Sequence, residues 1–163
     1  MPGRRQESAP TGSFGVTAAR SGSPIHFLPL TAAGSHFYLG GKSQTYIPEG
    51  VPLSKSTNDT ILTGSHYLDV VVPGGQEIYV DASGALTPPA RAAVSAPGAT
   101  APASLLALLL PMPLPPPTAA AWQVFSAQKN ATVPTGNIND CLGFDALAVP
   151  INTNTTQPTW EYI

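Results

Sequence analysis

Apolar and polar residues alternate with a period of two along much of the chain. Phe14, Val16 and Ala18 share one face of Phe14–Arg20, which is the pattern of a strand buried on one side. Further strand-like segments follow at Ile25–Leu30, Ser35–Gly40, Trp122–Ala127, Phe144–Ile151 and Thr159–Ile163. Pro29 limits the first of these to an edge or a bulge, because proline has no backbone N–H to donate to a neighbouring strand.

The most distinct element is a predicted β-hairpin. Two strands, Tyr67–Val72 and Gln76–Asp81, flank Pro73–Gly75, where proline presets φ and glycine accepts the positive φ that follows. The inner face is expected to hold Leu68, Val70, Val72, Ile78 and Val80, and the outer face Tyr67, Asp69, Glu77, Tyr79 and Asp81. A second turn is expected at Ala82–Gly84.

These elements predict an all-β protein. The sequence shows no amphipathic helical pattern of ten or more residues, and short strands at turn-rich spacing are typical of a sandwich or barrel. A length of 163 residues suits one domain. We therefore expect a single compact β-sandwich or small barrel over residues 13–163, after a non-native or disordered leader at 1–12. A β-trefoil is the alternative, because Ile78–Leu86 has the strand, Asp turn and Gly rhythm of a trefoil repeat.

The segment Pro88–Ala121 breaks this pattern. It consists mostly of Ala, Pro and Leu and contains one charge, Arg91. Its apolar run, Ala103–Leu110, is eight residues long, whereas a membrane span needs about 20. Five prolines between Pro111 and Pro117 then prevent a helix from continuing. We therefore expect a disordered low-complexity insertion, or a shifted reading frame, that interrupts the domain.

Composition narrows the function classes. Charged residues make up 10% of the chain, against about 25% in an average soluble domain, and the net charge is −2. This charge does not indicate nucleic-acid binding, because a nucleic-acid-binding surface needs clustered Lys and Arg. Cys141 is the one cysteine, so the chain has no internal disulfide. The N-terminus lacks the apolar core of a signal peptide, so the chain taken literally would stay in the cytoplasm.

Candidate catalytic and metal-binding residues do not form a recognisable motif. His26, His36 and His66 have spacings that match no compact metal site. The acids Asp69, Glu77 and Asp81 share the outer face of the predicted hairpin, where we interpret them as groups that keep an edge soluble rather than as a glycosidase pair. The sequence therefore predicts a protein without catalysis, cofactor or metal.

Two kinds of residue point to carbohydrate. Three N-glycosylation sequons begin at Asn58, Asn130 and Asn154, each in or beside a predicted loop. Exposed aromatic rings on a β-face also stack on the apolar faces of sugars. The aromatic candidates, which alternate with core residues or lie in the C-terminal strand, are Tyr38, Tyr67, Tyr79, Trp160 and Tyr162; of these, Tyr67, Tyr79 and Trp160 are the expected contacts.

The ordered set of motifs resembles the phiA-type cell-wall proteins of filamentous ascomycete fungi. The motifs are FGVTAARSGSPIHF (Phe14–Phe27), HFYLG (His36–Gly40), YLDVVVPGGQEIYVDASGAL (Tyr67–Leu86), WQVF (Trp122–Phe125), CLGFDALAV (Cys141–Val149) and the aromatic end TWEYI. The resemblance implies a secreted wall protein linked to phialide and conidium development, with IgE-binding allergens among its relatives and no enzymatic activity. It also implies a signal peptide and further cysteines, which this sequence lacks.

The leading interpretation is a non-catalytic secreted structural protein of the fungal cell wall. The alternative is a carbohydrate-binding module that uses exposed aromatics on wall polysaccharide. A small glycan-active enzyme is the third hypothesis. Wall polysaccharide is the expected partner; nucleic acid and a membrane span are not expected.

Overall fold

The computed structural model describes residues 12–53, 59–64, 67–87, 105–110, 121–126, 132–133 and 137–163. These residues form strands joined by turns, together with one short 3-10 helix, which confirms the all-β class. The strands are β1 (Ser13–Ala19), β2 (Leu30–Ala33), β3 (His36–Leu39), β4 (Thr45–Tyr46), β5 (Leu62–Thr63), β6 (Tyr67–Leu68), β7 (Gln76–Glu77), β8 (Tyr79–Val80), β9 (Leu86–Thr87), β10 (Leu105–Leu110), β11 (Ala121–Ser126), β12 (Leu142–Pro150) and β13 (Glu161–Tyr162), and the helix is η1 (Ile138–Asp140).

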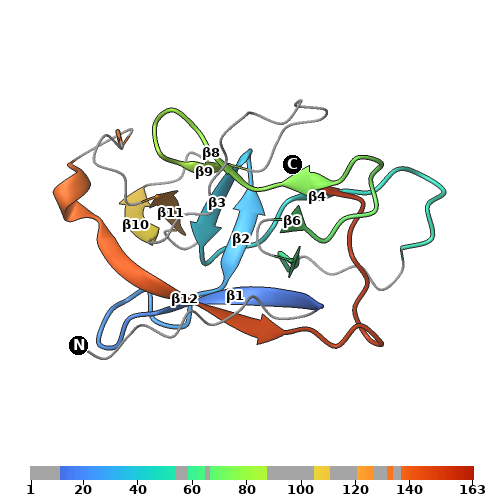
Figure 1. The fold of residues 1–163 in the computed structure, drawn as a ribbon, viewed down its shortest axis with the longest axis horizontal. Helices are drawn as coiled ribbons and strands as arrows, with labels where there is room; N and C mark the ends of the chain where they lie inside the picture. The colour runs from blue at the N-terminus through green and yellow to red at the C-terminus, as the bar shows by residue number, and fades with distance from the viewer. Residues whose placement is uncertain are drawn as a thin grey trace.

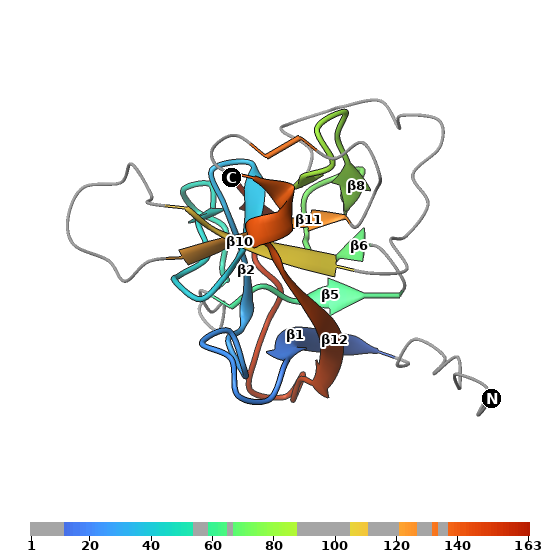
Figure 2. The same ribbon diagram turned by 90° about the vertical axis from the view of Figure 1, so that its left-hand side faces the viewer.

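Most strands belong to one antiparallel sheet in the order β2-β3-β11-β10-β12-β1-β5-β6-β7. Two small pairs, β4 with β13 and β8 with β9, complete the described part. The sheet curls, so that β1 and β12 run across the direction of β2 and β3 (Figure 1). Seen from the side, β12 descends from the level of β10 to lie along β1 (Figure 2). The curl encloses the core between crossed layers.

Alternation along the strands fills this core as the sequence predicts. Residues of β1 alternate between buried and half-buried, with Phe14, Val16 and Ala18 inside. In β3, Phe37 and Leu39 are fully buried. The remaining buried members of the main cluster come from many elements: Ile25, Leu30, Ala32, Leu62, Leu68, Leu86, Val124, Phe144 and Tyr162.

The curled sheet stops short of a closed barrel. Beyond β2, the segment before this strand contacts β1 at an isolated bridge between Thr17 and Pro29, and Ala18 exchanges backbone hydrogen bonds with Phe27 and Leu28. Because Pro29 has no N–H, it cannot donate a hydrogen bond to β1 at this point. The described strands therefore do not form a closed barrel, and the β-trefoil alternative stays a prediction.

The predicted hairpin forms with shorter strands than expected. Only β6 and β7 pair, and the Pro-Gly turn is present, with the Gly75 N–H donating to the Val72 carbonyl over 3.0 Å. The N–H groups of Val71 and Val72 instead donate to the carbonyls of Thr159 and Trp160. Residues 70–72 thus pair with the C-terminal segment instead of with the second strand of the hairpin. The local sequence pattern does not reveal this competition, because the competing segment is distant in the sequence.

The strand predicted at Ile25–Leu30 is mostly a turn. β2 begins only at Leu30, and the N–H groups of His26 and Leu28 donate to the carbonyls of Ser23 and Ile25. The turn is tight because Phe27 has a φ of 62°, in the left-handed region that bulky residues rarely adopt.

Leu105–Leu110 forms a strand, although we expect the whole segment Pro88–Ala121 to be disordered. These six residues form β10, which pairs with β11 on one edge and with β12 on the other. A strand with neighbours on both sides often reads as a continuous apolar run, which periodicity cannot distinguish from a helix segment. Ala121 is also described, as the buried first residue of β11, whereas residues 88–104 and 111–120 and the leader up to residue 11 lie outside the described residues.

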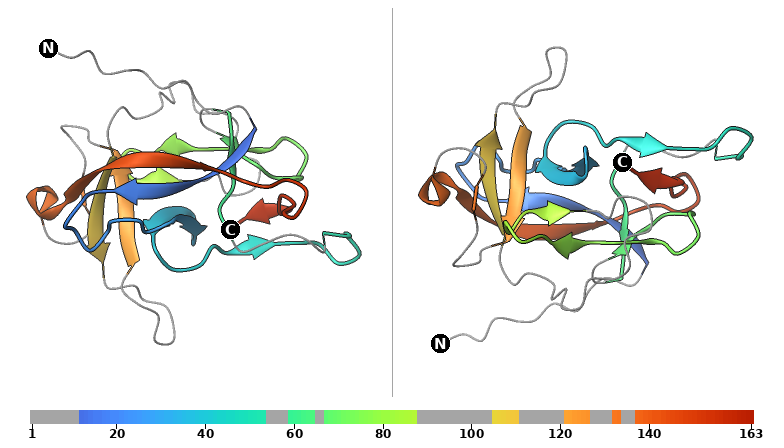
Figure 3. Two further views of the ribbon diagram at one scale, coloured as in Figure 1. Left: turned by 90° about the horizontal axis from the view of Figure 1, so that it is seen from below. Right: turned by 90° about the horizontal axis from the view of Figure 1, so that it is seen from above.

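One half of β12 lies along β1 alone in the described part of the sheet. The pairing with β10 ends at Phe144, whereas the pairing with β1 continues to Pro150. The Ile151 N–H donates to the Ser13 carbonyl. Because N–H and C=O groups alternate in direction along an antiparallel strand, those of the odd-numbered residues of β12 face β1, and those of Ala148 face away from it. Figure 3 shows β1 and β12 side by side, with β10 and β11 at one end of them.

Candidate functional site

The acids proposed from the sequence take part in local structure. Asp81 Oδ1 accepts hydrogen bonds from Ser83 N–H at 2.8 Å, from the Ser83 hydroxyl and from Ala85 N–H at 3.1 Å. This carboxylate therefore holds the predicted turn between β8 and β9. Asp69 accepts a hydrogen bond from the hydroxyl of Ser13 in β1, and Glu77 lies opposite Tyr67 in the β6–β7 ladder.

The two described histidines, His26 and His36, lie within local backbone structure rather than in a cluster of metal-binding groups. His26 Nδ1 accepts the Arg20 N–H at 3.0 Å. His36 begins β3, and its Nδ1 is buried. His66 lies outside the described residues. Among the side chains that the structure places, no group of three or more His, Cys, Asp or Glu comes together as a metal site.

Cys141 is a free, half-buried thiol. It packs with Val133 against the buried pair Ala85 and Phe125. Burial raises the pKa of the Cys141 thiol, and the negative charge of Asp140 raises it further. The thiolate, which is the nucleophilic form, is therefore disfavoured at neutral pH.

The three expected carbohydrate contacts lie on different elements. Tyr67 in β6 is 46% exposed. Tyr79 is half-buried in β8, which belongs to the separate β8–β9 pair. Trp160 is half-buried, and its carbonyl accepts the Val72 N–H. These rings therefore do not share one strand face.

Tyr162, expected among the exposed aromatics, belongs to the core instead. It is 2% exposed; its hydroxyl donates to the Asp59 carbonyl at 2.8 Å and accepts the Ile61 N–H at 2.9 Å. Burial raises its pKa to about 12, and the nearby carboxylates of Asp69 and Asp59 add to the rise. Burial likewise raises the pKa of Tyr38, which is half-buried.

One sequon lies in the described part of the chain. Asn154 is exposed, and its N–H donates to Asn152 Oδ1 at 3.0 Å. The N–H groups of Thr155 and Thr156 donate to the Asn152 carbonyl, which makes this segment a turn. Such a surface turn suits glycan attachment. Asn58 and Asn130 lie outside the described residues.

Phe27 is an exposed aromatic that sequence reasoning missed. Its side chain is 65% exposed, and its ring lies 3.8 Å from the His26 ring, centroid to centroid, at a tilt of 31°. Alternation predicts a strand here and gives Phe27 no special role. The Ser-Gly-Ser-Pro sequence before it indicates a turn, but the sequence contains no pattern that predicts a left-handed backbone at Phe27.

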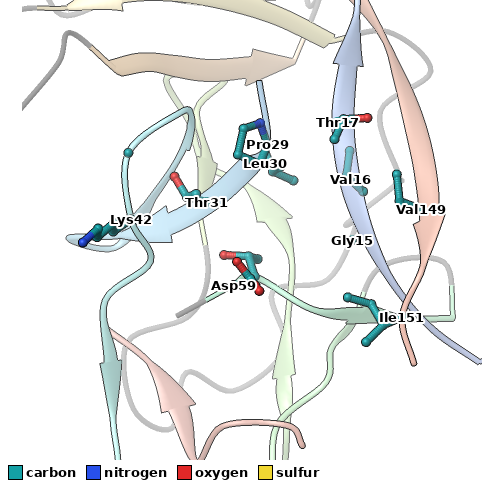
Figure 4. A pocket seen from close by; sticks show the side chains of 12 residues that line it. Gly15, Val16, Thr17, Pro29, Leu30, Thr31, Lys42, Asp59, Val149 and Ile151 are labelled. Carbon is teal, nitrogen blue, oxygen red and sulfur yellow. The ribbon is translucent and has the colours of Figure 1, made fainter. Parts of the chain in front are cut away.

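A pocket of about 340 Å³ opens where β1 and β2 separate (Figure 4). Its lining is Gly15, Val16, Thr17, Pro29, Leu30, Thr31, Gly41, Lys42, Asp59, Thr60, Val149 and Ile151. The Thr31 hydroxyl donates to the Gly40 carbonyl at 2.7 Å, and Thr60 Oγ1 accepts the Ala32 N–H at 2.8 Å. Both hydroxyls are thus committed to the fold, and the exposed Lys42 and Asp59 supply the charges of the pocket.

No helix among the placed segments is long and apolar enough to cross a membrane.

Comparison with known proteins adds family information to this geometry. A family model described as PhiA-like secreted protein matches residues 14–99. An uncharacterized secreted protein of Arthroderma benhamiae is 33% identical over 171 residues, covering 94% of this chain and 87% of that protein. Cell wall protein phiA of Aspergillus fumigatus is 40% identical over 77 residues, covering 47% of this chain and 41% of that protein. No solved structure matches.

Proposed function

Because the chain belongs to the family of PhiA-like secreted proteins, we propose that it is a non-catalytic structural protein of the fungal cell wall. Its contribution is that of a stable β-domain deposited among wall polysaccharides. Glycosylation at Asn154, in an exposed turn, fits this location.

The proposal that the protein has no catalytic activity is supported by the hydrogen bonds of the Asp81 carboxylate. A glycosidase acid needs a carboxyl group free to meet the scissile bond across a cleft. Asp81 Oδ1 instead receives three hydrogen bonds from its own turn. Asp81 is thus a structural cap, and Asp69 is tied to Ser13 in β1.

We extend the proposal to the formation of phialides and conidia, the developmental stage that the resemblance to phiA-type proteins implies. A strain lacking the gene is then expected to form fewer conidia, with the defect rescued by the intact chain. Rescue by Asp81→Asn, which keeps an oxygen acceptor for the turn, is the expected result for a structural role. Loss of rescue by a folded Asp81→Asn protein would favour catalysis.

The location is tested by fractionation. The tagged chain is expected in the wall fraction of hyphae, with incubation of the purified protein on β-glucan and chitin releasing no soluble sugar. Recovery of the chain only from the cell interior would contradict the proposal, and sugar release that is lost in Asp69→Asn or Glu77→Gln would show an enzyme instead.

A carbohydrate-binding role is the second candidate, favoured by the 46% exposure of Tyr67. An exposed ring on a strand can stack on the C–H face of a sugar. A pull-down on chitin and β-glucan tests it, with loss of retention in Tyr67→Ala and Tyr79→Ala as the supporting result and retention in both as the contrary one.

A further inference from the structure

Phe27 combines two features that folding alone disfavours. Its side chain is 65% exposed, the highest value among the large hydrophobic residues described as exposed. Its φ of 62° places a bulky residue in the left-handed region, which is strained for any side chain with a Cβ. Glycine would meet this backbone requirement without strain, so the retained phenyl ring calls for a reason outside the core.

Neighbouring groups hold the ring in place. The Phe27 N–H donates to the Ala18 carbonyl at 2.8 Å, which ties the turn to β1. His26 stacks on the phenyl ring, and its Nδ1 is fixed by the Arg20 N–H. The two rings, here called the His26–Phe27 platform, are therefore oriented before any ligand arrives, which lowers the entropic cost of binding.

The surroundings of the platform select the kind of ligand. Residues 21–24, which precede the platform in the same turn, are Ser, Gly, Ser and Pro, so the chain next to the ring supplies small and polar groups. A protein interface of useful affinity places its aromatic anchors within a larger desolvated area. A single sugar ring offers a C–H face of matching size, with hydroxyl groups around its edge.

Residues that can donate hydrogen bonds precede the platform along the chain. The Arg20 Nη1 donates to the Gly143 carbonyl at 2.6 Å, which anchors an exposed guanidinium that carries further N–H donors. Ser21 and Gly22 are exposed in the same turn. These donors suit the hydroxyl oxygens of a neutral sugar.

We propose that the His26–Phe27 platform binds a pyranose residue of a wall polysaccharide through stacking on the Phe27 ring. The proposal rests on the proposed wall location and adds the contact by which the protein is retained there. It places the main contact in the turn before β2, away from the aromatics of β6 and β8.

The test measures depletion of the purified full-length chain by insoluble β-glucan and by chitin particles. Phe27→Trp is expected to keep binding to the polysaccharide that retains the wild type, because a larger ring still stacks. Phe27→Ala and Phe27→Gly are expected to bind about tenfold more weakly or worse. Phe27→Gly is the sharper variant, since it relieves backbone strain and so separates loss of binding from loss of folding.

Tyr46→Ala is the matched control, because it removes another exposed aromatic ring, one that has no proposed part in binding. Full binding by Tyr46→Ala beside lost binding by Phe27→Gly supports the platform. Equal binding by wild type and Phe27→Gly, or no binding by the wild type to either polysaccharide, overturns it. Both overturning results leave the wall location intact, since fractionation of hyphae tests that location separately.

Discussion

The side-chain amide of Gln76 pairs with the backbone of Tyr162 as a neighbouring strand would. Gln76 Nε2 donates to the Tyr162 carbonyl at 2.9 Å, and the Tyr162 N–H donates to Gln76 Oε1 at 2.8 Å. Gln76 is 5% exposed, so both bonds are shielded from water. One polar side chain thereby joins the last strand of the chain to the edge of the large sheet.

Replacement of this amide is expected to be costly. Gln76→Leu leaves a buried N–H and a buried carbonyl of Tyr162 without partners, and each unsatisfied group costs about 1–3 kcal/mol of stability. We expect the free energy of unfolding to fall by about 2–4 kcal/mol, measured by urea denaturation. The control is Gln44→Leu, whose amide makes a solvent-exposed bond to the Gly34 N–H and should cost less than about 1 kcal/mol. Equal losses in both variants would contradict the assignment.

The buried Tyr162 hydroxyl predicts a loss of stability at high pH. Its pKa is about 12 in the folded chain against 10.0 for a free tyrosine, so folding favours the neutral phenol. This contribution is complete below pH 10.0 and is lost as the pH rises toward 12, because the unfolded chain ionises first. The full shift corresponds to about 3 kcal/mol.

Urea denaturation between these pH values measures that loss. Tyr162→Phe should remove this part of the pH dependence while costing about 1–3 kcal/mol at neutral pH, because the Ile61 N–H loses its acceptor. An unaltered pH profile in Tyr162→Phe would show that another group titrates there.

The left-handed backbone of Phe27 predicts an inverted order of glycine and alanine. Phe27→Gly is expected to be more stable than Phe27→Ala by about 0.5–1 kcal/mol, because relief of strain outweighs the greater flexibility of glycine when unfolded. At Leu147, in the extended strand β12, the alanine variant should be the more stable of the two. Thermal denaturation of the four variants gives both comparisons, and the same order at both sites would argue against strain at Phe27.

The position of β10 predicts a strong effect of proline. Ala107 pairs with Val124 of β11 and with Leu142 of β12, so Ala107→Pro removes a ladder hydrogen bond inside the sheet. We expect a loss of about 3 kcal/mol or more. Ala148→Pro is the matched control, because the Ala148 N–H faces away from β1, and its cost should be clearly smaller. Circular dichroism during urea denaturation measures the stability of both variants. If Ala107→Pro were as stable as the wild type, the placement of β10 inside the sheet would be contradicted.

Local alternation sufficed to predict the strands that are buried on one face. Phe14, Val16 and Ala18 were placed correctly inside, as were Phe37 and Leu39, because burial follows directly from period two. The turn chemistry of Pro73–Gly75 was equally local. These features depend on residues within one short window of the sequence.

Features that depend on distant partners were not predictable in the same way. Tyr162 is buried because Asp59 and Ile61 meet its hydroxyl, and Val71 leaves the hairpin because Thr159 supplies a better-placed carbonyl. The candidate site shows the same limit. Exposed Tyr67 was found from alternation, whereas Phe27 became visible only through its backbone conformation.

The pairing of β1 with β12 also has a consequence for synthesis. Phe14 lies opposite Pro150, so this ladder joins segments that are far apart in the sequence. The ribosome makes β1 before β12, so β1 lacks its main partner until residues 142–150 have been translated. Such distant contacts fold slowly. The β1–β12 part of the sheet therefore assembles only after β12 has been made, and a chain that is still unfolded is in the form that protein export machinery can thread across a membrane.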